Sequence, residues 1–164
     1  MVLSEVETGY GIKSFHMAAD GSGEQALLVP AGGSRKPASN ETVENKEHFL
    51  KMNGKEVFKF AVNVIPETVS KTLEKVNMTL ENVDLIVPHQ ANYRIVSSAA
   101  KKMNYPEDKF YMNLNKLGNT SGASIGLALD EALEKGMIKK GDNLIFVGFG
   151  AGLSYASMLL TWAY

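Results

Sequence analysis

The spacing of hydrophobic positions changes along the chain, and these changes divide it into predicted strands and helices. Apolar residues recur at steps of three and four across residues 55–76, which places them on one face of a helix. Asn53 and Gly54 open this segment. Pro66 lies inside it, and because proline has no backbone N–H donor, we expect the helix to be kinked or broken there.

Shorter apolar stretches predict the other elements. Asn92 is a good N-cap for a second helix that ends near Met103, and Gly136 follows a third helix over residues 121–133 as a C-terminal cap would. Residues 35–46 are polar and aperiodic, and we interpret them as a surface excursion. Brief apolar runs occupy residues 2–6 and 26–29, and strands are predicted at residues 11–18, 84–87, 110–112, 143–149 and 154–162.

This order of elements indicates an α/β fold. Parallel neighbours need a crossover helix, so the alternation predicts α/β/α layers around a mixed, mostly parallel central sheet of about five strands. The last two strands form a hairpin and add antiparallel pairing. Residues 9–164 are interpreted as one domain, and residues 1–8 as the end of a strand that was cut near its start.

Composition narrows the classes of function. The formal net charge of -1 gives no bulk attraction to nucleic acid or to an anionic membrane. No apolar run reaches the ~18–20 residues of a transmembrane helix, and no signal peptide is visible, so we expect a cytoplasmic protein. The chain has 0 Cys, and its acidic residues do not cluster at metal-ligand spacing. We therefore expect no disulfide, no metal site and no resident cofactor.

Two short segments carry the candidate chemistry. His89 follows Pro88 at the end of a buried strand, where open α/β sheets place their ligand crevice. Asn119 lies on a glycine-led turn just before a helix. Taken singly, His89 fits a core histidine satisfied by backbone groups and Asn119 an ordinary turn residue. A neutral imidazole and a carboxamide are also the two donors that an enolate-forming site would use.

The surroundings of both residues favour the chemical interpretation. The chain contains Val87-Pro88-His89-Gln90-Ala91-Asn92-Tyr93-Arg94-Ile95 and Leu117-Gly118-Asn119-Thr120-Ser121-Gly122-Ala123-Ser124. These segments, with residues 52–59 and 148–153, closely resemble the 3-oxoacyl-(acyl-carrier-protein) synthase III family, a condensing-enzyme branch of the thiolase superfamily. The resemblance covers nearly the whole chain but only the C-terminal half of the family's subunit. It implies a thiolase-like half domain over residues 9–164, with residues 1–8 as the tail of a strand from the missing N-terminal half.

The resemblance also implies a reaction and a set of roles. In that family a cysteine of the N-terminal half attacks an acyl-coenzyme A and holds the acyl group. A histidine and an asparagine, here His89 and Asn119, then bind the thioester carbonyl of malonyl-acyl-carrier protein and stabilise the enolate left by loss of carbon dioxide. The backbone N–H at the position of Ala151 faces the acyl thioester. The substrates are a coenzyme A thioester and the phosphopantetheine arm of the carrier protein.

Further residues are implied in binding the substrate and the acidic carrier protein. Arg94 and Lys101 are seven residues apart and share one helix face, with Lys102 adjacent. The resemblance assigns these three, with Lys59, to carrier-protein recognition, although charges on a helix face are often only solvated. It also places Gly54, Phe58 and Asn92 at the substrate site. The helical spacing of Phe58 favours core packing instead.

The absent cysteine is the main departure from the family pattern. The polypeptide alone is expected to be inactive in condensation because it cannot form the acyl-enzyme. Either it is a fragment of a longer synthase or it assembles with a separate, Cys-bearing N-terminal half. The exposed face of a lone half is expected to drive self-association into a homo-oligomer. Two other functions stay open, a non-catalytic docking module for acyl-carrier protein and half of a polyketide or hydroxymethylglutaryl synthase type of enzyme.

Overall fold

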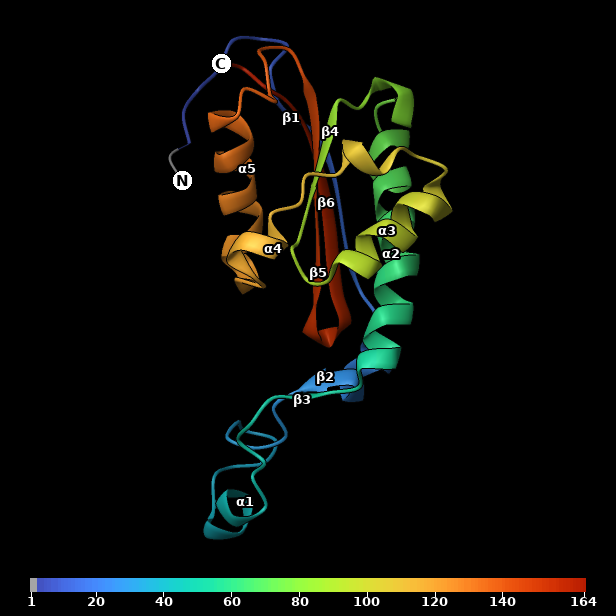
Figure 1. The fold of residues 1–164 in the computed structure, drawn as a ribbon. Coiled ribbons are helices and arrows are strands. Elements are labelled where there is room, and N and C mark those ends of the chain that lie inside the picture. The colour runs from blue at the N-terminus through green and yellow to red at the C-terminus, as the bar shows by residue number, and fades with distance from the viewer. Residues whose placement is uncertain (1–2) are drawn as a thin grey trace.

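The computed structural model describes residues 3–164 and has three layers, with a sheet between two sets of helices (Figure 1). The helices are α1 (Asn40–Glu44), α2 (Gly54–Glu74), α3 (Tyr93–Met103), α4 (Leu114–Leu117) and α5 (Ser124–Glu134). The strands are β1 (Gly11–Ala19), β2 (Leu27–Leu28), β3 (Lys51–Met52), β4 (Leu85–Pro88), β5 (Asn143–Gly150) and β6 (Ser154–Thr161). Helices α2 and α3 cover one face of the sheet, and α5 covers part of the other. The predicted α/β fold is confirmed.

The central sheet has four strands in the order β1-β6-β5-β4. Its predicted pairing was wrong in two respects. First, β6 lies between β1 and β5 and is antiparallel to both, so only β4 and β5 pair in parallel. Second, residues 110–112 form no fifth strand; Phe110 makes one isolated bridge to Ile86, because the chain turns away to Asn113 and α4. The hairpin predicted at the C-terminus is confirmed, and its return strand is what separates β1 from β5.

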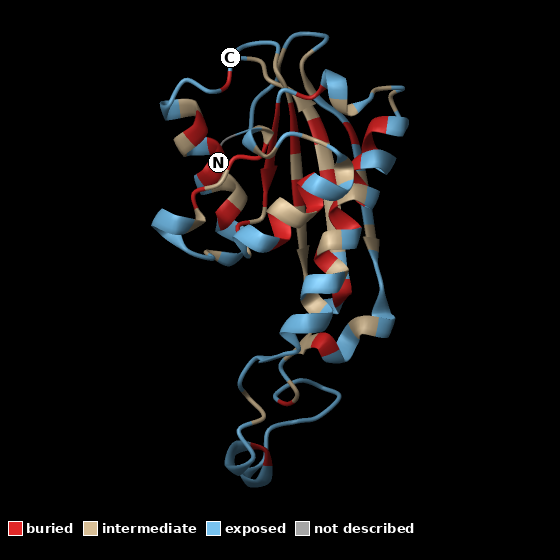
Figure 2. Cartoon of the chain, turned by 45° about the vertical axis from the view of Figure 1, so that its right-hand side comes forward, coloured by how far each residue is buried: buried red, intermediate tan, exposed pale blue. Residues whose placement is uncertain are grey.

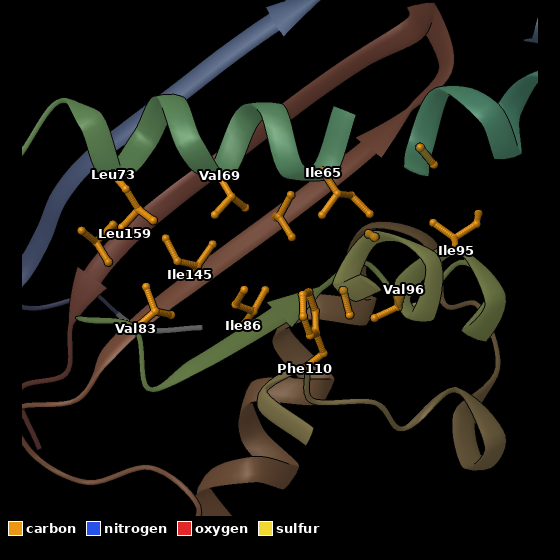
Figure 3. Close-up of a cluster of buried hydrophobic side chains, with 14 residues drawn as sticks. Ile65, Val69, Leu73, Val83, Ile86, Ile95, Val96, Phe110, Ile145 and Leu159 are labelled. Carbon is orange, nitrogen blue, oxygen red and sulfur yellow. The ribbon is translucent and has the colours of Figure 1, made fainter. Parts of the chain in front are cut away.

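Two hydrophobic cores lie on opposite faces of the sheet. On the side of α2, Ile65 and Val69 pack with Ile86, Ile145 and Leu159 (Figure 3). On the other side, Leu85, Val87 and Leu144 pack against Ala128, Leu129 and Ala132 of α5. The wholly apolar β4 is therefore buried on both faces, as its sequence predicted, and it carries the chain to His89.

Helix α2 begins as expected and passes through its proline. The Asn53 side chain accepts a hydrogen bond from the N–H of Glu56 and caps the helix. Pro66 was expected to kink or break the helix, and the break was wrong, since α2 is continuous from Gly54 to Glu74. A proline within a helix costs about 3 kcal/mol, but Ile65 and Val69 on either side are fully buried and contribute roughly 1.5–3 kcal/mol each.

The polar excursion forms an arm that projects beyond the layers (Figure 1). Its base is the two-stranded sheet of β2 and β3, and its tip is α1, whose N-cap Ser39 forms a capping box with Thr42. Most of the arm is exposed (Figure 2). The expected surface position is therefore confirmed.

The described segment before β1 is not part of the central sheet. Residues 3–10 precede β1 outside any strand, and Met1 and Val2 lie outside the described residues. The assignment of residues 1–8 to a strand of another half stays a prediction. Within residues 3–164, no helix combines the length and the apolar character needed to cross a bilayer.

Candidate active site

A cavity of about 580 Å³ opens at the carboxyl end of β4. Its lining comes from segments that are far apart in the sequence and includes Phe58, His89, Asn92, Asn119, Ser124 and Phe149. His89 and Asn119 thus contribute to one cavity, although 30 residues of sequence separate them. This is where the rule for open α/β sheets places a ligand.

His89 is held in the cavity by its backbone, its ring nitrogen and its ring edge. Its backbone N–H donates to the carbonyl of Val147 in β5 at 2.8 Å. Its Nδ1 lies 2.7 Å from the hydroxyl oxygen of Ser124, and its ring meets Phe149 edge-on at 5.6 Å. Burial lowers the pKa of His89 below 6.5, because a half-buried cation loses hydration. The imidazole is therefore neutral at pH 7.

Asn119 is oriented by a turn. The chain leaves α4 through Gly118, whose φ of 69° lies in the left-handed region that favours glycine. The side-chain oxygen of Asn119 then accepts a hydrogen bond of 2.9 Å from the N–H of Ser121. This bond engages the oxygen of the carboxamide, and among residues 3–164 no group accepts a hydrogen bond from its NH₂ group.

Three residues assigned to substrate binding also line the cavity. Gly54 opens α2, and Asn92 caps α3 by accepting a hydrogen bond of 2.8 Å from the N–H of Arg94. The side chain of Asn92 therefore has a structural task at the rim. Phe58 is 37% exposed and lines the cavity, so the core packing expected from its helical spacing was wrong. Phe58 lies in the second turn of α2.

Ala151 occupies a neighbouring position. It is exposed and begins the turn Ala151–Leu153 between β5 and β6. Gly150 lines the cavity that holds His89, whereas Ala151 lines an adjacent hollow of about 830 Å³ together with Leu27. Its role as a backbone donor to an oxyanion stays a prediction.

The four basic residues lie outside the cavity lining, as far as residues 3–164 describe it. Lys102 donates to the side chain of Asn63, and Asn63 donates to the carbonyl of Lys59 at 2.8 Å. The backbone carbonyl of Lys59 and the ammonium group of Lys102 therefore both contact Asn63, where α2 meets α3. Lys101 faces Glu107 and helps to lower the pKa of that carboxyl group, after the hydrogen bonds from Tyr93 and Ser97.

Arg94 lies near the cavity, in the first turn of α3 and two residues after Asn92. Its side chain is exposed. Of the four basic residues, Arg94 follows the histidine segment most directly.

Sequence reasoning missed several residues of this site. Ser124 lies in the same segment as Asn119, but its contact with His89 requires α5 to pack beside the end of β4. Leu27, Leu50 and Met52 line the cavity from the base of the arm. Nothing in the hydrophobic pattern separates these three from ordinary exposed side chains, so only the fold identifies them.

Comparisons with known proteins identify the family of this chain. Residues 73–162 match the family model described as "3-Oxoacyl-[acyl-carrier-protein (ACP)] synthase III C terminal". The beta-ketoacyl-[acyl-carrier-protein] synthase III of Fusobacterium nucleatum is 52% identical over 99% of this chain and 50% of its own length. That of Caldanaerobacter subterraneus is 51% identical over 99% of this chain and 49% of its own length.

Solved structures give the same result. The synthase III of Thermus thermophilus superposes with a TM-score of 0.84 at 40% identity, covering 98% of this chain and 49% of that one. The corresponding structure from Aquifex aeolicus gives a TM-score of 0.83 at 36% identity, over 97% and 47%. The chain spans about half the length of these relatives. It belongs to the 3-oxoacyl-[acyl-carrier-protein] synthase III family, of which it forms the C-terminal, thiolase-like part.

Proposed function

We propose that this chain is the enolate-forming half of a fatty-acid-initiating condensing enzyme. It binds malonyl-acyl-carrier protein and promotes its decarboxylation. A Cys-bearing N-terminal half supplies the acyl thioester that is attacked. The observation that carries the proposal is the shared cavity lined by His89 and Asn119.

Decarboxylation places negative charge on the thioester oxygen. The bond between the malonyl carboxylate and the α-carbon breaks and carbon dioxide leaves. The electron pair of the broken bond stays with the α-carbon and forms the enolate with the thioester carbonyl. His89, neutral because of burial, and the NH₂ group of Asn119 donate hydrogen bonds to that oxygen. Neither donor must ionise. Removing one such donor costs about 10²–10³ in rate in sites of this kind.

Condensation then needs a nucleophile that this chain does not contain. The enolate carbon attacks the acyl-cysteine carbonyl, the carbon–sulfur bond breaks, and the thiolate leaves with a 3-oxoacyl product formed. With 0 Cys, the 164 residues supply no thiolate, so the cysteine comes from the other half. The length of the relatives, about twice that of this chain, supports such a partner.

An uncovered apolar face supports the same arrangement. On the side of the sheet that carries α5, Phe15 and Met17 of β1 are 55% and 71% exposed. They border a hollow of about 960 Å³ that Ile125, Phe149 and Gly150 also line, so it adjoins the cavity of His89. We expect the N-terminal half to cover this face. Without that half, the exposed face is expected to cause self-association, which sedimentation at increasing concentration would detect.

The carrier protein would dock beside the rim. Carrier proteins are acidic, and exposed cations near a cavity mouth speed their encounter. Arg94 is the strongest candidate by position. Lys59 of α2 and Lys102 of α3 lie outside the cavity lining, and Lys101 is partly offset by Glu107. The two other functions are less well supported, because the relatives described above are named for acyl-carrier-protein synthases.

The test combines this chain with a Cys-bearing N-terminal half. Condensation of acyl-coenzyme A with malonyl-acyl-carrier protein is expected only from the mixture, and decarboxylation of malonyl thioester also from this chain alone. His89→Ala and Asn119→Ala are each expected to lower decarboxylation by about 10²–10³. Carrier-protein binding without product in the mixture would favour a docking module. Decarboxylation unchanged in both variants would refute the proposed roles.

A further inference from the structure

The hydroxyl group of Ser124 lies between two groups of the histidine segment. Ser124 is the first residue of α5 and is 1% exposed. Its Oγ is 2.7 Å from Nδ1 of His89, and it accepts a hydrogen bond of 3.3 Å from the backbone N–H of Gln90. A single buried side chain therefore contacts both the ring of His89 and the backbone that follows it.

Counting hydrogens decides the direction of the Ser124–His89 bond. A hydroxyl group has one hydrogen to donate and two lone pairs to accept with. Gln90 supplies a donor that uses one lone pair. Within residues 3–164, Nδ1 of His89 is the only acceptor within hydrogen-bond distance of the Ser124 hydroxyl. Burying that hydrogen without an acceptor would be costly, so the hydroxyl donates to Nδ1.

This direction fixes the chemistry of the other ring nitrogen. A neutral imidazole carries one hydrogen, so an Nδ1 that accepts leaves the hydrogen on Nε2. We propose that Ser124 is a positioning residue that holds His89 in the Nε2–H tautomer, so that the ring presents a donor rather than a lone pair to the cavity. The proposal rests on the proposed function, because a donor is what a thioester enolate requires.

The neighbourhood of Ser124 restrains the arrangement further. The side chain of Gln90 donates to the carbonyls of Pro88 and Tyr111 at 2.9 and 3.0 Å and accepts from the N–H of Asn113 at 3.0 Å. These bonds fix the backbone N–H that Ser124 accepts from. The edge contact with Phe149 limits rotation of the imidazole ring. Ser124 is thus one of several groups that hold His89 in place.

Nitrogen NMR on the whole chain, with labelled histidine, tests the tautomer without any activity. The chain has 3 His, so His16 and His48 serve as internal references, and His89→Ala identifies the third signal. At pH 7 we expect an acceptor-type shift for Nδ1 of His89 and a donor-type shift for Nε2. In Ser124→Ala, the Nδ1 shift should move toward that of an unbonded nitrogen, and Ser124→Thr should retain it. A donor-type Nδ1 in the unmodified chain, or unchanged shifts in Ser124→Ala, would overturn the proposal.

Decarboxylation of malonyl-coenzyme A provides a second measurement. Loss of the partner that orients a metal-bound histidine commonly costs about 10–100-fold in activity. By analogy, Ser124→Ala is expected to lower kcat about 10-fold with KM nearly unchanged. Ser124→Thr should restore most of that loss. Ser14→Ala is the matched control, because Ser14 is also buried and its hydroxyl donates to the carbonyl of Thr72 at 2.7 Å, far from the cavity. Equal kcat losses in Ser124→Ala and Ser14→Ala would count against a positioning role.

The two measurements separate this inference from the proposed function. If His89→Ala keeps full decarboxylation, the proposed function fails, whatever the tautomer. If His89→Ala loses activity and Ser124→Ala changes neither the nitrogen shifts nor kcat, only the role of Ser124 fails.

Discussion

Replacing Gln90 with leucine tests how the site is attached to the fold. Gln90 is 1% exposed, and its side chain connects the end of β4 to the segment that leads into α4. Its amide nitrogen donates to the carbonyl of Tyr111, and its oxygen accepts from the N–H of Asn113. Leucine has similar volume but can make neither bond. The substitution therefore removes hydrogen bonding without opening a large cavity.

The expected loss of stability follows from the groups left unpaired. A buried polar group that loses its partner costs about 1–3 kcal/mol, and Gln90→Leu removes the partner of three backbone groups, the carbonyls of Pro88 and Tyr111 and the N–H of Asn113. We expect the free energy of unfolding to fall by about 3 kcal/mol. With an m-value of about 2 kcal/mol/M, the urea midpoint would decrease by roughly 1.5 M.

Equilibrium unfolding in urea, followed by circular dichroism, measures this change. Gln25→Leu is the matched control, because Gln25 is exposed, and its substitution should alter stability by less than about 0.5 kcal/mol. If Gln90→Leu loses less than about 1 kcal/mol, these buried bonds do not hold this part of the fold together. The interpretation of Gln90 as a structural connector would then be wrong.

Three other predictions concern docking, pH and the core. Arg94→Glu is expected to weaken binding of acyl-carrier protein at low salt. Lys140→Glu should not, because Lys140 precedes β5 and lies at the opposite end of the parallel strands β4 and β5. Equal effects of the two variants in a binding titration would remove Arg94 from the proposed docking site. Burial lowers the pKa values of His16 and His89 below 6.5, so near and below pH 6.5 the unfolded chain binds more protons than the folded chain. The urea midpoint should therefore decrease from pH 7 to pH 5, and a midpoint that rises would contradict these shifts. Leu159→Ala removes a fully buried side chain from the core under α2 and should cost about 2–5 kcal/mol in the same assay, and a loss below 1 kcal/mol would refute its place in that core.

Local sequence patterns were sufficient to predict several of the helices and strands. The stripe along α2, the wholly apolar β4 and the Asn92 cap of α3 all occur as predicted, because local hydrogen bonding and burial favour the same conformation there. The strand predicted at residues 110–112 did not form. A short apolar run can be buried without strand pairing, and Phe110 and Tyr111 fill the two cores from an irregular segment.

The sequence by itself determined the α/β class and the family resemblance, and it pointed to His89 and Asn119 as the candidates for enolate chemistry. These depend on local patterns that can be read from neighbouring positions. Only the tertiary structure decided that β6 separates β1 from β5, that Phe58 faces a cavity, and that Ser124 contacts His89. The physical reason is that each of these features depends on how distant segments pack across the sheet. The hydrophobic periodicity of one segment gives no information about the free energy of that packing.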